Sequence, residues 1–267
     1  MAQNPDLKLG LDYWDTQEAS INGVLGGFGN GPLPRIDSLS SRQFLMSLRT
    51  DLCRVPSALR RLDAPPLDVP RRRIRALDVG AGIGRVTASV LLPLVDDVVL
   101  VEPAEHFISR AMQDSPKWKG IPDASKSVTF VRSPLQSFDP AVVPQGYRAG
   151  RPFDPSSPET GFDVVWCQWC LGHLPDDDLV EFFKRSKAVL RGPENPQRPR
   201  DAGVIIVKEN TTEDGAGGAP VAIYAEDDSS VTRSDAAWRH LFQRAGLVVV
   251  QDEVQKGLPV DLLEVKS

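Results

Sequence analysis

The 267-residue chain has few cysteines, no long apolar run and no excess of basic charge, and each absence excludes a class of protein. Three cysteines are too few for a disulfide-rich secreted fold and suit a reducing cytosol or nucleus. No segment approaches the roughly 18 apolar residues of a membrane span, and residues 1–10 do not resemble a secretory signal. The net charge of −5 argues against direct nucleic-acid binding. We therefore expect a cytoplasmic or nuclear protein without a membrane or nucleic-acid partner.

Two of the cysteines, Cys167 and Cys170, have the CxxC spacing of some redox and zinc sites. Both lie in the apolar segment FDVVWCQWCLGHL, and the chain has no second pair that would complete a zinc site. We therefore expect them in the core or in a pocket wall, and we expect no metal site.

From about residue 74 the sequence alternates short β-rich runs with helical stretches. The patterns predict strands at residues 74–79, 97–103, 127–133, 162–169 and 203–210, a weak strand near 262–265, and helices at 86–95, 104–112, 176–190 and 234–245. The apolar run 247–253 follows the last helix. This alternation predicts an α/β fold with a parallel sheet and helices on both faces, which binds ligands at the carboxyl ends of its strands.

Before residue 70 the pattern is helical, at residues 11–22 and 37–62, with the loop GVLGGFGNGPLPR between them. We therefore expect an N-terminal helical extension over residues 1–70, packed on a main domain over residues 71–267. The proline-rich stretches at 65–70, 140–158 and 192–200 indicate surface loops.

The strongest local motif is DVGAGIGR, residues 78–85, between the first predicted strand and the first helix after it. Its spacing is G-x-G-x-G, whereas the dinucleotide fingerprint requires G-x-G-x-x-G. Glu102 ends the next strand, where a carboxylate can accept both hydroxyls of a ribose. This pair of features alone leaves an NAD-dependent oxidoreductase open.

Four segments together resemble the family of α-N-terminal protein methyltransferases. They are YW with NGVLGGFG, LDVGAGIGRVT with LLPL, VVWCQWCLGHLPD, and VIIVKEN with DDSSVTRSD. The resemblance spans nearly the whole chain. It implies a class I methyltransferase, Rossmann-like fold with a mostly parallel seven-stranded sheet. It also implies that S-adenosylmethionine donates a methyl group, leaving S-adenosylhomocysteine, to the α-amine of proteins that begin X-Pro-Lys or X-Pro-Arg.

The resemblance also implies roles for individual residues. Cofactor binding would fall to Gly80, Arg85, Glu102, Leu135, Gln136 and Gln168. Catalysis would fall to His173, Asp228 and Asn210, and substrate binding to Trp14, Leu25, Trp169 and Ser230. The third substrate residue would pair with Glu226, Asp227 or Asp228. The chain departs from the family at Ala225, where relatives often have a second acid, and in a longer loop before Asp227.

These residue types suit the chemistry. A protein α-amine has a pKa of about 7.7–8.0, so a modest base suffices to deprotonate it. His173 and Asp228 are the candidate bases, and Asn210 would fix the amine. Trp14 and Trp169 would wall the channel, where aromatic faces attract a methylated, cationic product.

The resemblance further implies that ribosomal or chromatin-associated proteins are the partners and that the enzyme is a monomer. Two other interpretations remain open beside the NAD-dependent one. The chain could be a small-molecule N- or O-methyltransferase on the same fold, or a non-catalytic protein that keeps the fold as a scaffold.

Overall fold

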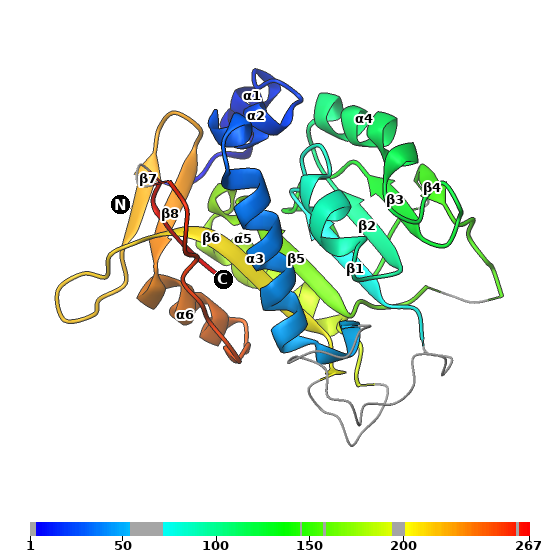
Figure 1. Cartoon of the computed structure of the whole chain (residues 1–267). Coiled ribbons are helices and arrows are strands. Elements are labelled where there is room, and N and C mark those ends of the chain that lie inside the picture. The colour runs from blue at the N-terminus through cyan, green and yellow to red at the C-terminus, as the bar shows by residue number, and fades with distance from the viewer. Residues whose placement is uncertain (1–3, 54–71, 145, 157–158, 194–200, 260–261) are drawn as a thin grey trace.

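A computed structural model describes residues 4–53, 72–144, 146–156, 159–193, 201–259 and 262–267 (Figure 1). The predicted loop at 65–70, most of the loop at 192–200 and the part of the predicted helix 37–62 beyond residue 53 lie outside these ranges. No helix within the described residues is both long and apolar enough to cross a membrane.

Five parallel strands form the centre of the sheet, and all five coincide with predicted strands. They are β1 (Arg75–Val79), β2 (Asp97–Val101), β3 (Ser127–Val131), β5 (Val164–Gln168) and β6 (Val204–Thr212). Every residue of the first four is buried, as expected for parallel strands that helices cover on both faces. The order β3-β2-β1-β5-β6 reverses direction beside β1. The α/β prediction is therefore confirmed.

Within the described residues the sheet has nine strands, whereas the resemblance implies seven. Four short strands flank the central five; β9 (Glu264–Lys266) coincides with the weak strand predicted near 262–265, and the other three lie where no strand is predicted. β4 (Arg148–Gly150) pairs antiparallel with β3 inside the stretch predicted as a surface loop. β7 (Ala222–Ala225) and β8 (Ser230–Ser234) form a hairpin, and β9 pairs antiparallel with β6. The apolar run 247–253 forms no strand; Val248 and Val250 are 83% and 74% exposed.

Helices cover both faces of the sheet (Figure 1). One face packs against α3 (Leu33–Leu48), α4 (Glu105–Asp114) and a π-helical turn at Thr87–Leu91. The other face packs against α5 (Asp176–Ala188) and α6 (Asp235–Arg244). Ser234 caps α6 as its sequence predicts, since its side chain accepts a hydrogen bond from the Ala237 N–H.

The N-terminal segment forms α1 (Leu7–Asp15) and α2 (Ile21–Val24) before α3. The single helix predicted at 11–22 is therefore wrong: Ser20 caps a new helix by accepting the Gly23 N–H. The helix predicted from residue 37 begins at Leu33, directly after Pro32, and ends at Leu48. Figure 1 shows α1 and α2 beside the turn of the β7–β8 hairpin, while α3 runs along the sheet.

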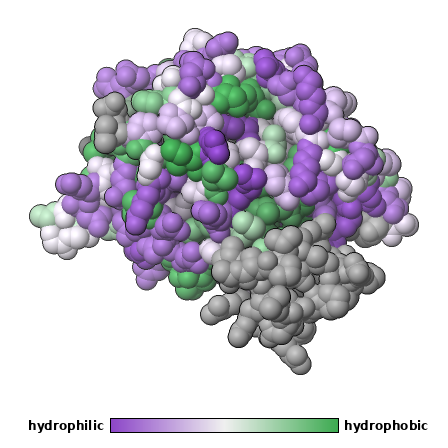
Figure 2. Space-filling view, in the orientation of Figure 1, coloured by the Kyte–Doolittle hydropathy of each residue, from purple (hydrophilic) through white to green (hydrophobic). Residues whose placement is uncertain are grey.

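The face that carries α3 is chemically mixed. Figure 2 shows its apolar residues in several small groups among hydrophilic ones.

Candidate active site

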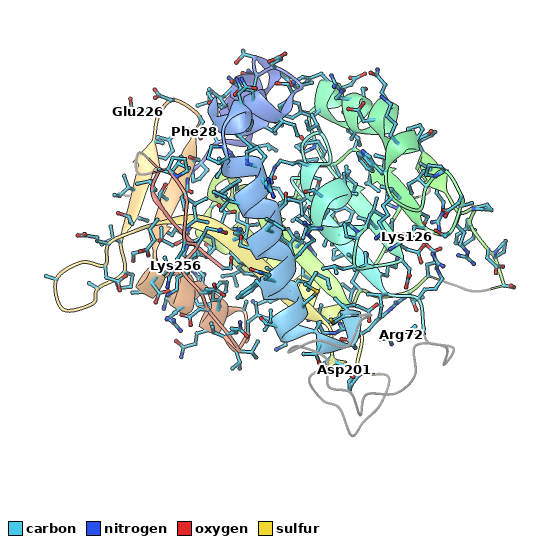
Figure 3. The ribbon with its side chains drawn as sticks, in the orientation of Figure 1. Phe28, Arg72, Lys126, Asp201, Glu226 and Lys256 are labelled. Carbon is cyan, nitrogen blue, oxygen red and sulfur yellow. The ribbon has the colours of Figure 1, made fainter. Side chains whose placement is uncertain are left out.

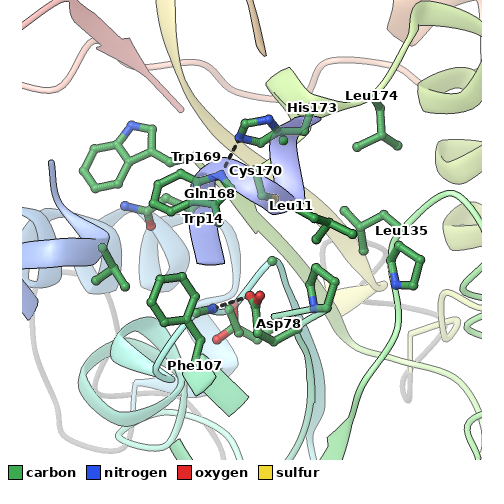
Figure 4. Close-up of a pocket in the computed structure, with 18 of the residues that line it drawn as sticks. Leu11, Trp14, Asp78, Phe107, Leu135, Gln168, Trp169, Cys170, His173 and Leu174 are labelled. Carbon is green, nitrogen blue, oxygen red and sulfur yellow. Dashed lines mark hydrogen bonds between the residues drawn. The ribbon is translucent and has the colours of Figure 1, made fainter. Parts of the chain in front are cut away.

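A pocket opens at the carboxyl ends of β1, β2 and β5, beside the point where the strand order reverses. This is the position at which α/β sheets bind ligands. Its wall combines the loops after these strands with one face of α1. Nine of the thirteen predicted site residues line it, namely Trp14, Gly80, Arg85, Glu102, Leu135, Gln136, Gln168, Trp169 and His173. Figure 4 shows several of them converging on the cavity.

The glycines of the loop after β1 are required by close packing as well as by the turn. Gly80 has a φ of +58°, and a Cβ there would lie 2.3 Å from the Cβ of Cys170. Gly84 has a φ of +78°, and its Cβ would lie 2.3 Å from the ring of Trp118. The side chains of Cys170 and Trp118 therefore pack directly against the loop backbone, and no residue larger than glycine fits at either position.

Glu102 holds the same loop through its carboxylate. One oxygen accepts the Gly82 N–H at 2.7 Å and the other accepts the Ala104 N–H at 2.8 Å. Burial raises the pKa of Glu102 to about 7, against the effect of these two donors. A carboxylate has about four acceptor sites, so it retains capacity for the hydroxyls of a ribose.

Two polar side chains reach the pocket next to the loop. The Arg85 guanidinium lies 5.4 Å from the centroid of the Trp169 ring and is an ion-pair partner of Asp37. Gln168 donates from its amide to the same Asp37 carboxylate at 2.9 Å. Arg85 therefore brings a positive charge to an otherwise largely apolar wall.

Both cysteines of the CxxC pair are free and buried. Cys170 lines the pocket, and its thiol donates to the Val79 carbonyl at 3.3 Å. Burial raises the pKa of both thiols well above the usual value, which makes thiolate chemistry unfavourable. The described residues contain no cluster of His, Cys, Asp and Glu suited to a metal ion.

The segment after β5 is strained. Trp169 has a φ of +54°, an uncommon conformation for a bulky residue, and its indole N–H is buried without a hydrogen-bond partner. Glu209 on β6 fixes the next residues, because one of its oxygens accepts the N–H groups of Cys170 and Leu171, both at 2.9 Å. Burial raises the pKa of Glu209 to about 7.

His173 lies where this segment meets α1. Trp14 donates its indole N–H to Nε2 of His173 at 2.9 Å, as the dashed line in Figure 4 shows. Burial lowers the pKa of His173, although the negative charge of Asp228 opposes this shift. The ring is therefore neutral near pH 7, with Nε2 as the acceptor and its proton on Nδ1. Nδ1 is buried without a hydrogen-bond partner.

Asp228 is in the turn between β7 and β8, above α1. A Cβ placed on Gly10 of α1 would lie 3.3 Å from His173 Nδ1 and 3.6 Å from the Asp228 carbonyl oxygen, so both residues meet at this glycine. One carboxylate oxygen of Asp228 is buried without a partner. Glu226 lies at the tip of the same hairpin, as labelled in Figure 3, and is exposed.

Four predicted site residues do not line the pocket. They are Leu25, Asn210, Asp228 and Ser230. Leu25 is buried at the end of α2, and its neighbour Val24 reaches the wall instead. Asn210 lies in β6 opposite Val265 of β9.

From the inner face of α1, the sequence predicted only Trp14 as a site residue. Leu7, Gly10, Leu11 and Trp14 line the pocket, and their spacing of i, i+3, i+4 and i+7 is that of one helical face. This periodicity could have identified them. The contacts of Asp37 and Glu209 follow from tertiary packing and leave no comparable pattern in the sequence.

The geometry fits an adenosyl ligand with an amino-acid tail. Glu102 offers acceptors for ribose, Leu135 and Pro134 an apolar wall, and Arg85 a cation for a carboxylate. The unpartnered buried polar groups of His173 and Asp228 lie on the side of α1, and that of Trp169 lies on a ring 5.4 Å from the Arg85 guanidinium.

Comparisons with known proteins agree with this geometry. A family model described as AdoMet dependent proline di-methyltransferase matches residues 5–267. Alpha N-terminal protein methyltransferase 1 of Arabidopsis thaliana is 34% identical over 257 residues, covering 96% of this chain and 76% of that protein. N-terminal Xaa-Pro-Lys N-methyltransferase 1-B of Xenopus laevis is 31% identical over 258 residues, covering 96% and 91%. The solved structure of a SAM-dependent methyltransferase from Leishmania major has a TM-score of 0.66 and 27% identity, covering 96% of this chain and 79% of that one.

Proposed function

Because the chain belongs to the family of AdoMet-dependent proline di-methyltransferases, we propose that it methylates the α-amine of proteins that begin X-Pro-Lys or X-Pro-Arg. The observation that carries the proposal is the position of His173 and Asp228, which meet at Gly10 beside the pocket of the glycine loop. The expected class I methyltransferase fold and the dependence on S-adenosylmethionine are confirmed, and the NAD-dependent alternative is set aside.

S-adenosylmethionine supplies an electrophilic methyl group on a positively charged sulfur. We assign its ribose to Glu102, its methionine carboxylate to Arg85, and its adenine to the wall near Leu135 and Gln136. Gly80 and Gln168 border the same cavity. These contacts would fix the donor, so that the enzyme's main contribution is to align nitrogen, methyl carbon and sulfur.

The chain's own residues would prepare the amine. Asp228 has a buried oxygen without a partner, which suits it to accept an N–H of the incoming ammonium group. Neutral His173 is close enough to share in removing the proton, although its Nε2 is occupied by Trp14 and would first have to be released. These two residues would pass the proton to solvent, which would leave the nitrogen lone pair free to take the methyl group that S-adenosylmethionine supplies.

Aromatic and acidic residues would select the substrate. Trp14 and Trp169 form walls that favour a cationic, methylated nitrogen. Asp227 and Glu226 are exposed on the β7–β8 turn, where they could pair with the Lys or Arg at the third substrate position. We retain Asn210 as a catalytic residue that fixes the amine, and Leu25 and Ser230 as substrate contacts. None of the three lines the pocket, so the bound peptide would have to reach beyond the pocket wall.

We also retain the proposals that the enzyme is a monomer with an extension (1–70) and a main domain (71–267), and that it methylates ribosomal or chromatin-associated proteins in the cytoplasm or nucleus. The low cysteine count supports such a compartment. Light scattering at working concentration would test whether the enzyme is a monomer. Identification of the protein N-termini that lose methylation in cells without the enzyme would test the proposed substrates.

A peptide series tests the function. The enzyme, S-adenosylmethionine and a Ser-Pro-Lys peptide should give a methylated product by mass spectrometry, whereas the N-acetylated peptide should remain unmodified. A peptide with glutamate at the third position should react poorly. Methylation of free small amines with no methylation of the peptide would instead favour a small-molecule methyltransferase.

A further inference from the structure

Asp37 is a fully buried carboxylate that connects the N-terminal extension to the pocket. It lies on α3, and its side chain has an exposed fraction of 0%. One oxygen pairs with Arg85. The other accepts from the Gln168 amide at 2.9 Å and pairs with the Lys208 ammonium at 2.6 Å. A single side chain from α3 thus holds groups that follow β1, end β5 and lie in β6.

Two of these three partners line the pocket, and Lys208 does not. Arg85 is 9% exposed, and its bond to Asp37 uses one terminal nitrogen of the guanidinium. A guanidinium has five N–H donors in a fixed plane, so fixing one of them determines where the remaining donors point. Asp37 therefore sets the orientation in which Arg85 faces the cavity.

The charges in this cluster are strongly coupled. Burial alone would raise the pKa of Asp37, but Arg85 and Lys208 more than compensate and lower it. Burial lowers the pKa of Lys208, and Asp37 opposes that shift. Two buried cations therefore depend on one carboxylate, and removal of this carboxylate leaves both without their anion.

We propose that Asp37 is a positioning residue for the cofactor, which aims Arg85 and Gln168 at the methionine moiety of S-adenosylmethionine and so makes α3 part of the cofactor site. This inference rests on the proposed function, because it takes the Arg85 pocket as the cofactor site. Unlike a purely structural role, a positioning role predicts that substitution of Asp37 weakens the binding of ligands that carry the amino-acid tail and spares ligands that lack it.

The experiment compares two ligands on the full-length enzyme by titration calorimetry. S-adenosylhomocysteine carries the amino-acid tail, whereas 5′-methylthioadenosine keeps the nucleoside and thioether without it. Asp37→Asn should weaken S-adenosylhomocysteine by about tenfold or more, the effect of losing one hydrogen bond to a charged group. Its affinity for 5′-methylthioadenosine should change by less than about threefold.

A matched control lies one position along the helix. Ser38 is also buried, and its hydroxyl bonds to Pro34 and Ser89 without contacting Arg85. Ser38→Ala should leave the affinities of both ligands unchanged.

A double variant tests whether lower stability of Asp37→Asn, and not lost positioning of Arg85, explains its weaker binding. Asp37→Asn combined with Lys208→Met removes one negative and one positive charge, so the cluster keeps its net charge. If this variant recovers the wild-type melting temperature but still binds S-adenosylhomocysteine weakly, the positioning role holds. Equal weakening of both ligands, or full recovery of affinity in the double variant, would overturn it. If the wild-type enzyme binds neither ligand, the proposed function fails first.

Discussion

The two halves of the site are built differently. Around the glycine loop, the Glu102 carboxylate bonds to backbone N–H groups, and Asp37 secures Arg85 and Gln168. Beside α1, His173 and Asp228 each bury a polar atom without a partner, and so does Trp169 next to Arg85. Buried polar groups are normally hydrogen-bonded, and these three lie in or beside the pocket, where a bound peptide could supply their partners. The comparison indicates a preorganised cofactor half and a substrate half that the peptide completes.

The largest effect should come from Gly80→Ala. The new Cβ would lie 2.3 Å from the Cβ of Cys170 at a φ of +58°, so overpacking and backbone strain together should cost about 2–6 kcal/mol of stability. Binding of S-adenosylhomocysteine, followed by calorimetry, should be lost. Gly192→Ala is the control, because nothing lies within 4 Å of its Cβ. Retained binding in Gly80→Ala would show that the loop is not preorganised by this packing.

Asp228→Asn should lower peptide turnover without changing cofactor binding. It removes the charge that would draw a proton from the amine, so turnover of a Ser-Pro-Lys peptide should fall by about 100-fold or more. The affinity for S-adenosylhomocysteine should not change, because Asp228 does not line the pocket. Asp178→Asn, at an exposed position on α5, controls for the loss of one negative charge. Normal turnover in Asp228→Asn would remove this residue from the mechanism.

Glu102→Gln tests the cofactor half through pH. Burial raises the pKa of Glu102 to about 7, so the folded protein retains a proton that the unfolded chain releases near pH 4.5. Stability therefore falls as pH rises between these values, by up to about 3 kcal/mol from this residue. The variant should melt with a weaker pH dependence and should bind the cofactor less tightly.

Some pH dependence should remain in Glu102→Gln, because burial also raises the pKa of Asp78 to about 6 and that of Glu209 to about 7. Glu181→Gln, exposed on α5, should melt like the wild type. An identical pH profile for wild type and Glu102→Gln would contradict the assignment.

The smallest effect should come from treatment with a chelator and a reducing agent. Cys167 and Cys170 are free, and the described residues offer no metal cluster. Turnover of the peptide should stay within error of the untreated enzyme. A clear loss of turnover with the chelator would contradict this expectation and would indicate a metal site.

The two halves also differed in how far sequence could predict them. All six residues predicted to bind the cofactor line the pocket, and two of them, Gly80 and Arg85, belong to one short motif at residues 78–85 that directly follows β1. The substrate half is assembled from α1, the segment after β5 and the β7–β8 turn, which are distant in sequence. Its residues follow from how these elements pack.

Particular residues show the limit. Trp14 was predicted from its motif, but its bond to His173 depends on the position of α1 over the sheet. Asp37 and Glu209 are buried acids whose partners come from distant strands, and a charged residue in a sequence gives no sign of such burial. Leu25 is predicted to line the channel, but it is buried at the end of α2, and Val24 lines the pocket wall.

Fragmentation mass spectrometry of a methylated Ser-Pro-Lys peptide that also contains internal lysines tests the central claim most directly. We expect methyl groups only on the N-terminal nitrogen, and none on any lysine or on the N-acetylated peptide. Methylation of lysine side chains, or equal labelling of the acetylated peptide, would contradict a site in which His173 and Asp228 receive a free α-amine.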